Sequence, residues 1–162
     1  MRTNATRRAT RADRVPRLAL SVQTGESAGD CPADRAQLRR WVRAALSHDA
    51  ALTLRFVGES EGRALNAGYR GRDYATNVLT FTYDPPTDDT GPLQADIVIC
   101  LPVVAREALA QNKSVRDHLA HLVVHGVLHA QGMDHEDDAQ AREMEARETE
   151  VLRRFRIADP YR

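Results

Sequence analysis

Three histidines near the C-terminus, His125, His129 and His135, are the residues best placed to do chemistry. His125 and His129 are four residues apart, so on a helix their imidazoles leave from one face, one turn apart. Gly132 follows where a helix can end in a left-handed turn that glycine enters without strain. That turn would bring His135 back to the first two rings. Three imidazoles around one point, with a fourth position open, form a catalytic zinc site, and we expect one zinc ion per chain.

The same spacing occurs in metzincin proteases, whose motif is His-Glu-x-x-His-x-x-Gly-x-x-His. In those enzymes the glutamate takes a proton from the metal-bound water. Here Gly126 occupies that position and has no side chain to act as a base. The spacing therefore indicates a metal-activated water but argues against peptide hydrolysis.

Three further side chains lie close to this motif in the sequence. His121 is one turn before His125 on the same helical face, so it could hydrogen-bond to a ligand, while a packing role fits it equally well. His118 is more simply interpreted as a packed histidine. Asp134 adjoins a ligand, and we interpret it as a carboxylate of the turn or a partner of the ligands, not as a general base.

Length, charge and cysteine content indicate one globular domain. The chain has 162 residues, a net charge of zero and only two cysteines, Cys31 and Cys100, too few for a disulfide framework. No long apolar run or signal peptide is present, so we expect a cytoplasmic protein without membrane partners. Residues 1–15 are rich in arginine and lack periodicity, which predicts a disordered basic arm before a domain over residues 16–157.

Hydrophobic periodicity predicts alternating strands and helices, with a helical C-terminal half. An α+β fold follows, in which one small mixed sheet of about four strands packs against several helices. The zinc site would lie on a helix of the C-terminal half and on the turn after it. The expected strands are 18–22, 51–57, 77–81 and 97–101, and the expected helices are 38–46, 60–69, 102–111, one beginning after Ser114, and 138–155.

Two separated blocks of sequence resemble the YbeY family of bacterial endoribonucleases. Residues 125–135 resemble that family's His-Gly-x-Leu-His-x-x-Gly-Tyr-Asp-His signature. Residues 66–81 resemble its Asn-x-x-Tyr-Arg, Asp and Thr-Asn-Val-Leu-Ser-Phe segment, and Asp96-Ile97 resembles part of its Gly-Asp-Ile strand. Met144 and Glu148 also occupy positions where the family's last helix carries similar residues. The likeness covers about residues 50–155.

The resemblance implies a zinc-dependent, single-strand-specific endoribonuclease that acts in rRNA maturation, notably at the 3′ end of 16S rRNA. Its partners would be rRNA, ribosomal particles and other maturation factors. The resemblance places Arg70 in the cleft beside the metal, where a guanidinium could grip two phosphate oxygens. It also makes Asn66, Tyr69 and Asn77 candidates for RNA contact or for support of the site.

Two other functions remain open at this stage. The chain could be a ribosome-assembly factor in which a metal only stabilises the helix and its turn. A zinc peptidase with a base from elsewhere ranks last because of Gly126. The sequence also leaves open whether water or a ribose 2′-hydroxyl attacks, and which metal is native, because imidazoles suit nickel, copper and iron as well as zinc.

Overall fold

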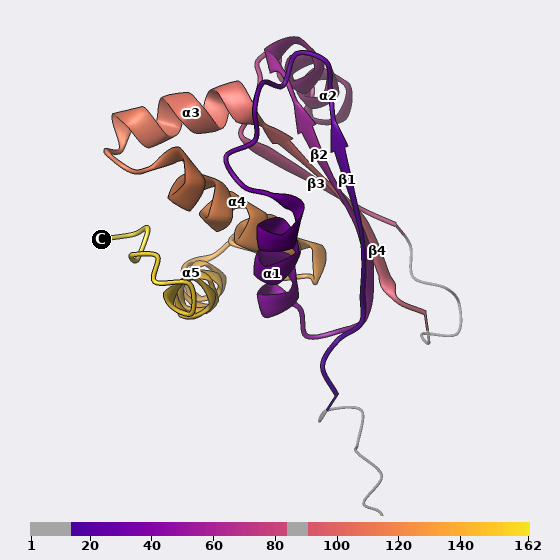
Figure 1. Cartoon of the computed structure of the whole chain (residues 1–162), viewed down its shortest axis with the longest axis vertical. Helices are drawn as coiled ribbons and strands as arrows, with labels where there is room; N and C mark the ends of the chain where they lie inside the picture. Colours follow the sequence, from indigo (N-terminus) through magenta and orange to yellow (C-terminus); the bar gives the residue numbers. More distant parts are fainter. Residues whose placement is uncertain (1–13, 84–90) are drawn as a thin grey trace, which may run out of the picture.

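A mixed four-stranded sheet organises the part of the chain that the structure describes, residues 14–83 and 91–162 of a computed structural model (Figure 1). Its strand order is β1-β2-β4-β3, where β1, β2 and β4 are parallel and β3 is antiparallel to β4. The strands are β1 (Leu18–Thr24), β2 (Ala50–Val57), β3 (Val78–Thr82) and β4 (Leu93–Cys100). The helices are α1 (Arg35–Ala45), α2 (Glu59–Arg70), α3 (Leu101–Ala110), α4 (Val115–Ala130) and α5 (Asp138–Arg153). The predicted α+β class is confirmed.

Each predicted element is present, and the differences lie at the ends. β4 begins at Leu93, four residues before the predicted start, because Leu93 pairs with Ala50 of β2. The sequence analysis recognised only the continuous apolar second half of this strand. In its first half, the polar residues Gln94 and Asp96 interrupt the apolar run. α5 ends at Arg153, slightly earlier than predicted. Most of the predicted arm, residues 1–13, and residues 84–90 lie outside the described residues.

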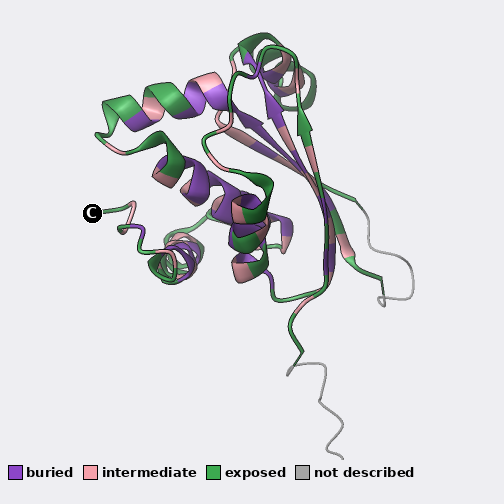
Figure 2. Ribbon diagram, viewed as in Figure 1, coloured by how far each residue is buried: buried purple, intermediate pink, exposed green. Residues whose placement is uncertain are grey.

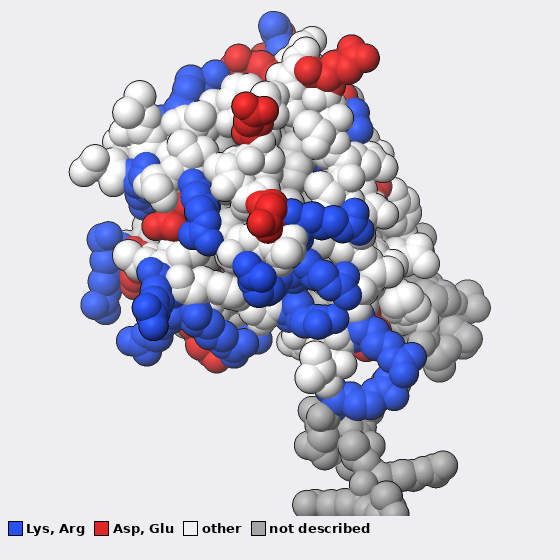
Figure 3. All heavy atoms as spheres, viewed as in Figure 1, with Lys and Arg blue, Asp and Glu red and all other residues white. Residues whose placement is uncertain are grey.

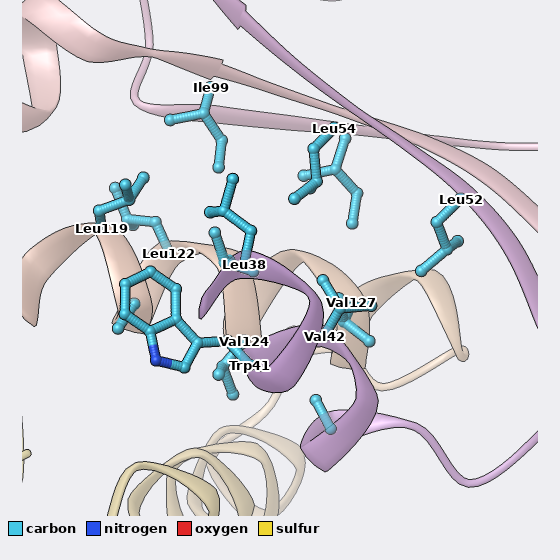
Figure 4. Close-up of a cluster of buried hydrophobic side chains, with 14 of the residues drawn as sticks. Leu38, Trp41, Val42, Leu52, Leu54, Ile99, Leu119, Leu122, Val124 and Val127 are labelled. Carbon is cyan, nitrogen blue, oxygen red and sulfur yellow. The ribbon is translucent and has the colours of Figure 1, made fainter. Parts of the chain in front are cut away.

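The main core lies between one face of the sheet and the helices α1 and α4, and α5 packs against these two helices. Figure 2 shows buried positions along the inner sides of these helices and along the strands that face them. Trp41 of α1 is fully buried, and the guanidinium of Arg116 lies over its ring. Figure 4 shows how side chains of α1, α4 and the sheet meet in this core, including Leu38, Leu54, Ile99, Leu119 and Val127.

A second, smaller apolar cluster forms beneath α2. It contains Val57, Leu79, Val98, Cys100 and Val103. α2 packs against β4 and α3 in this region, and Leu65 lies against the cluster. The cluster fixes α2, and with it Arg70 at the end of α2, to the end of the sheet.

α4 approaches the sheet most closely at Gly126. A Cβ atom at this position would lie 2.8 Å from Cγ2 of Ile97 in β4, closer than real Cβ atoms come to other heavy atoms. Ile97 is fully buried and branched at Cβ, so its methyl group has little room to move. The residue that replaces the protease glutamate therefore has a packing role, because it lets α4 lie against β4.

None of the helices in residues 14–83 and 91–162 is both long and apolar enough to cross a membrane.

We predict that Gly126→Ala destabilises the protein by about 1–3 kcal/mol, because the added methyl overpacks the contact with Ile97. Gly68→Ala is the matched control: Gly68 is also helical, but a Cβ there meets no atom within 4 Å. The free energy of unfolding of that variant should rise by up to about 1 kcal/mol, because alanine has a higher helix propensity than glycine. Urea unfolding of both variants measures the difference. Equal or greater stability of Gly126→Ala would show that α4 and β4 are not in tight contact.

Candidate metal centre

The three predicted ligands lie together at the C-terminal end of α4. Ser114 caps the helix as predicted, since its Oγ accepts a hydrogen bond from the Asp117 backbone N–H at 3.0 Å. The ring centroids of His125 and His129 are 6.3 Å apart, and those of His135 lie 5.7 Å from His125 and 6.2 Å from His129. The predicted convergence of the three imidazoles is therefore present in the fold.

A left-handed turn at Gly132 returns the chain to the helix. Gly132 has a φ of +94°, its N–H donates to the carbonyl of His129, and the N–H of Met133 donates to the carbonyl of Leu128. This pair of bonds is the Schellman pattern, in which a glycine after the helix satisfies the last carbonyls. The Gln131 side chain ties the turn to α1, because it donates to the Ala45 carbonyl and accepts from the Ser47 N–H. The turn is thus fixed by tertiary contacts as well as by the glycine.

Hydrogen bonds from Nδ1 orient two of the three rings. His129 Nδ1 is 2.9 Å from the carbonyl oxygen of Met133, which can only accept, so this nitrogen carries the proton. His125 Nδ1 is 2.6 Å from Oε1 of Glu148 and donates to that carboxylate. With Nδ1 protonated, Nε2 of each ring is the unprotonated edge that can bind a metal.

Glu148 is a buried carboxylate that joins three parts of the chain. It accepts from His125, from His121 Nε2 at 2.7 Å and from the Tyr161 hydroxyl at 2.5 Å. Burial alone would raise the pKa of Glu148, but the hydrogen bonds from His121, His125 and Tyr161 outweigh it and lower the pKa to about 2. Burial and the nearby carboxylate raise the pKa of Tyr161, which stays a neutral donor. An ionised Glu148 is therefore available as an acceptor at neutral pH.

Three imidazoles are ligands that suit a zinc ion, but their ring centroids are slightly too far apart for a closed zinc site. Zn–N bonds of about 2.0–2.1 Å would set the imidazole centroids of a tetrahedral site roughly 5 Å apart. The observed centroids are 5.7–6.3 Å apart. Within residues 14–83 and 91–162, no three His, Cys, Asp or Glu side chains already stand at metal-binding distances. Small rotations of the three rings would be needed to close the site around a metal.

Sequence reasoning did not assign Glu148 a role, although a signal was present. Met144, Val151 and Leu152 form the buried stripe of α5, and Glu148 is the one acid in that stripe, four residues after Met144. An acid on the apolar side of a helix must find partners inside the protein. Nothing in the sequence around Tyr161 indicated that its hydroxyl would contact Glu148.

The other candidates have distinct structural roles. His121 bonds to Glu148, as a partner of the ligands would, and His118 is buried against Glu107. Asp134 accepts from the His135 N–H at 2.8 Å and so stabilises the turn. Asn77 donates to Glu107 at 3.0 Å and also accepts from the Val78 N–H, which ties the start of β3 to α3.

Of the two roles expected for Asn66, RNA contact or support of the site, its burial favours support. Its side chain is only 1% exposed, and its amide donates to the carbonyl of Tyr74 at 2.7 Å. Asn66 instead holds the loop after α2 against the helix. Tyr69, in contrast, is 70% exposed and lies against Phe81 of β3, with ring centroids 4.2 Å apart.

Arg70 is the last residue of α2, before Gly71 ends the helix in the left-handed conformation. The following loop is tied to α2 by two hydrogen bonds of 2.7 Å between Arg63 and Asp73. Arg70 is exposed, and its side chain forms no hydrogen bond or ion pair with the described residues. Among the described residues, the hydrogen bonds of the histidine side chains do not include Arg70. β3 links the two regions, because Phe81 contacts Tyr69 and α4 packs against β3.

We predict that Glu148 makes the stability of the protein sensitive to acid. Its pKa of about 2 lies below the 4.5 of an exposed glutamate, so its ionisation stabilises the fold above pH 4.5. This contribution, on the order of 3 kcal/mol, should be lost as the pH falls from about 4.5 towards 2. Urea unfolding at several pH values should show a shallower decline for Glu148→Gln than for the wild type. Parallel declines would show that Glu148 is not ionised and hydrogen-bonded as described.

A family model and individual relatives of this chain agree on the same protein family. A sequence model described as Endoribonuclease YbeY matches residues 26–156. A protein named Endoribonuclease YbeY from Cupriavidus pinatubonensis is 58% identical over 149 residues, which cover 91% of this chain and 73% of the relative. One of the same name from Thiobacillus denitrificans is 53% identical, with 91% and 98% covered. A third, from Azoarcus sp., is 54% identical over 93% of this chain, which spans 62% of that relative's length.

The fold also has a counterpart among solved structures. The solution structure of TM1509 from Thermotoga maritima superposes with a TM-score of 0.52 at 24% identity, covering 85% of this chain and 91% of that chain. At this identity the likeness concerns the fold alone. The family match, which extends from Glu26 to Arg156 and includes all three histidines and Arg70, shows that this chain belongs to the YbeY family.

Proposed function

We propose that this chain is a zinc-dependent, single-strand-specific endoribonuclease that acts in rRNA maturation and ribosome biogenesis. The observation that carries the proposal is the histidine cluster at the end of α4. There, His125 and His129 each donate from Nδ1 to an acceptor of the protein, which leaves Nε2 unprotonated. The name Endoribonuclease YbeY, which the relatives bear, supports RNA as the substrate. The proposed target is the 3′ end of 16S rRNA in the cytoplasm, with ribosomal particles and other maturation factors as partners.

His125, His129 and His135 would hold the metal through imidazole nitrogens. A bound zinc ion would lower the pKa of a coordinated water from 15.7 towards about 7 and polarise a phosphoryl oxygen. Glu148 holds the His125 ring through Nδ1, and the Met133 carbonyl does the same for His129. Such partners fix the tautomer of a ligand and increase its basicity.

Arg70 would bind the scissile phosphate. A guanidinium can donate two parallel hydrogen bonds to a phosphate and stabilise the charge that develops during cleavage. Arg70 is exposed, and no described carboxylate neutralises it. Arg70 is the last residue of α2 and follows Tyr69, whose ring lies against Phe81 of β3.

Three exposed tyrosines between the end of α2 and the end of β3 could stack on bases. Tyr69 is 70% exposed, Tyr74 51% and Tyr83 53%. Stacking on aromatic faces is the usual way in which proteins hold unpaired bases with little sequence preference. These tyrosines support the choice of single-stranded RNA over a duplex.

The packing of Gly126 is a further argument against a peptidase. A glutamate at this position would have to displace Ile97 from the core, so α4 cannot carry the protease base without moving away from β4. A ribosome-assembly factor that does not cleave RNA is the remaining alternative, and cleavage assays separate the two.

We predict that Arg70→Ala lowers the rate of RNA cleavage by about 10²–10³-fold, as expected for loss of a donor that stabilises transition-state charge. The assay uses end-labelled precursor of 16S rRNA, free and within ribosomal particles, and zinc-loaded protein. Arg142→Ala, a change on the exposed surface of α5, is the matched control and should cleave like the wild type. His129→Ala, prepared in parallel, should lose zinc and activity together.

Equal cleavage by the wild type, Arg70→Ala and His129→Ala would indicate a contaminating nuclease. Absence of cleavage by the wild type, even on particles, would favour the assembly factor.

We also predict that Glu148→Gln weakens zinc binding by about 10–100-fold, the usual effect of losing a partner that orients a ligand. Competition with a chromogenic chelator measures the affinity. Glu150→Gln is the control, because Glu150 is exposed and pairs only with Arg147 and Arg154 among the described residues. Unchanged zinc affinity in a folded Glu148→Gln protein would argue against His125 as a ligand.

A further inference from the structure

A second basic surface lies over α1, apart from Arg70. α1 carries four arginines and no acid, and Arg17 lies just before β1. We call the surface formed by these side chains the α1 arginine face; it consists of Arg17, Arg35, Arg39, Arg40 and Arg43. Figure 3 shows basic side chains gathered over α1 and over the segment that leads into β1.

The charges of the α1 arginine face are not neutralised by neighbouring acids. Several arginines elsewhere on the surface pair with carboxylates, as Arg55 does with Glu61 and Arg106 with Glu59. In residues 14–83 and 91–162, no carboxylate lies within ion-pair distance of any of the five guanidiniums of the face. Asp34 and Asp49, the acids that flank α1, accept hydrogen bonds from the backbone N–H groups of Gln37 and Arg17.

The spacing of these arginines places like charges beside one another. Arg35, Arg39 and Arg43 follow at intervals of four residues, so they form a row along one side of α1. Like charges at this spacing repel and destabilise a helix. An anion with charges along its length would remove that repulsion.

Two arginines of the row are held in place by the edge of the sheet. Arg35 Nη2 donates to the Leu20 carbonyl at 2.8 Å, and Arg39 Nη2 donates to the Leu18 carbonyl at 3.0 Å. β1 is an edge strand, so these bonds occupy carbonyls that would otherwise be open to another strand. Each guanidinium has five N–H donors, and the others remain available.

The α1 arginine face lies away from the histidine cluster. α1 is joined to α4 by a hydrogen bond of 3.0 Å from Arg116 to Gln37. Arg116 precedes His125 by nine residues, which is two and a half helical turns, so the two side chains leave opposite sides of α4. A ligand on the α1 arginine face would therefore not occupy the candidate metal centre.

We propose that the α1 arginine face binds the phosphate backbone of the RNA substrate at a point remote from the cleaved bond. This inference rests on the proposed ribonuclease function. Guanidiniums suit phosphates, and the only aromatic residue of α1, Trp41, is fully buried. The surface would thus position RNA without reading its bases.

The test compares Arg40→Gln/Arg43→Gln with Arg142→Gln/Arg153→Gln, a control that removes the same charge from the acidic helix α5. Arg40 and Arg43 are exposed, and the one side-chain bond of Arg40 is to Gln37, so the fold should persist. Binding to a labelled RNA of the 16S 3′ region is followed by fluorescence anisotropy between 50 and 200 mM salt. We expect the α1 variant to bind about tenfold more weakly, with a salt slope lower by about 1.4, and the control to bind like the wild type.

Zinc content and melting temperature of both variants should match the wild type. Unchanged RNA affinity of the α1 variant, or an equal loss in the control, would overturn the proposal. Unchanged affinity for RNA together with lost co-sedimentation with ribosomal particles would also overturn it, and would assign the face to a ribosomal protein. If the wild type cleaves RNA while the α1 variant binds normally, only this inference fails. If the wild type neither binds nor cleaves RNA, the proposed function fails with it.

Discussion

The hydrogen bonds to Glu148 connect the candidate metal centre on α4 with α5 and the C-terminal segment. A carboxylate with only 1% of its side chain exposed requires donors, and it finds them on α4 and in the C-terminal segment. These bonds hold α5 and residue 161 against α4. They also place a proton on Nδ1 of His125, which leaves Nε2 as the edge that can bind a metal. One buried charge thus contributes to the tertiary structure and to the chemistry of the candidate site.

The second constraint is the close contact of α4 with the sheet at Gly126. This contact sets the depth at which α4 lies, and therefore where its neighbouring histidines emerge. It also excludes a glutamate beside His125. The difference from the protease motif therefore has a structural cause in the packing of α4 on β4.

The molecule presents positive charge in two places with different properties. Arg70 stands at the end of α2 beside exposed tyrosines, where both phosphate and bases could be held. The α1 arginine face lacks exposed aromatic rings and lies on the far side of α4. In the proposed function, Arg70 would bind the phosphate at the cleaved bond, and the α1 arginine face would bind the RNA backbone at a remote point.

The sequence by itself determined the local features of this protein. Histidines four residues apart on a helix, a glycine at its end and alternating apolar residues act over a few positions. They were therefore enough to predict the convergence of the three histidines, the turn at Gly132 and the order of strands and helices. The tertiary structure decided what depends on contacts between distant segments. It buried Asn66, brought Glu148 of α5 to His125 across 23 residues, and set Gly126 against Ile97. No local pattern encodes such distances, because they arise only when the helices pack together on the sheet.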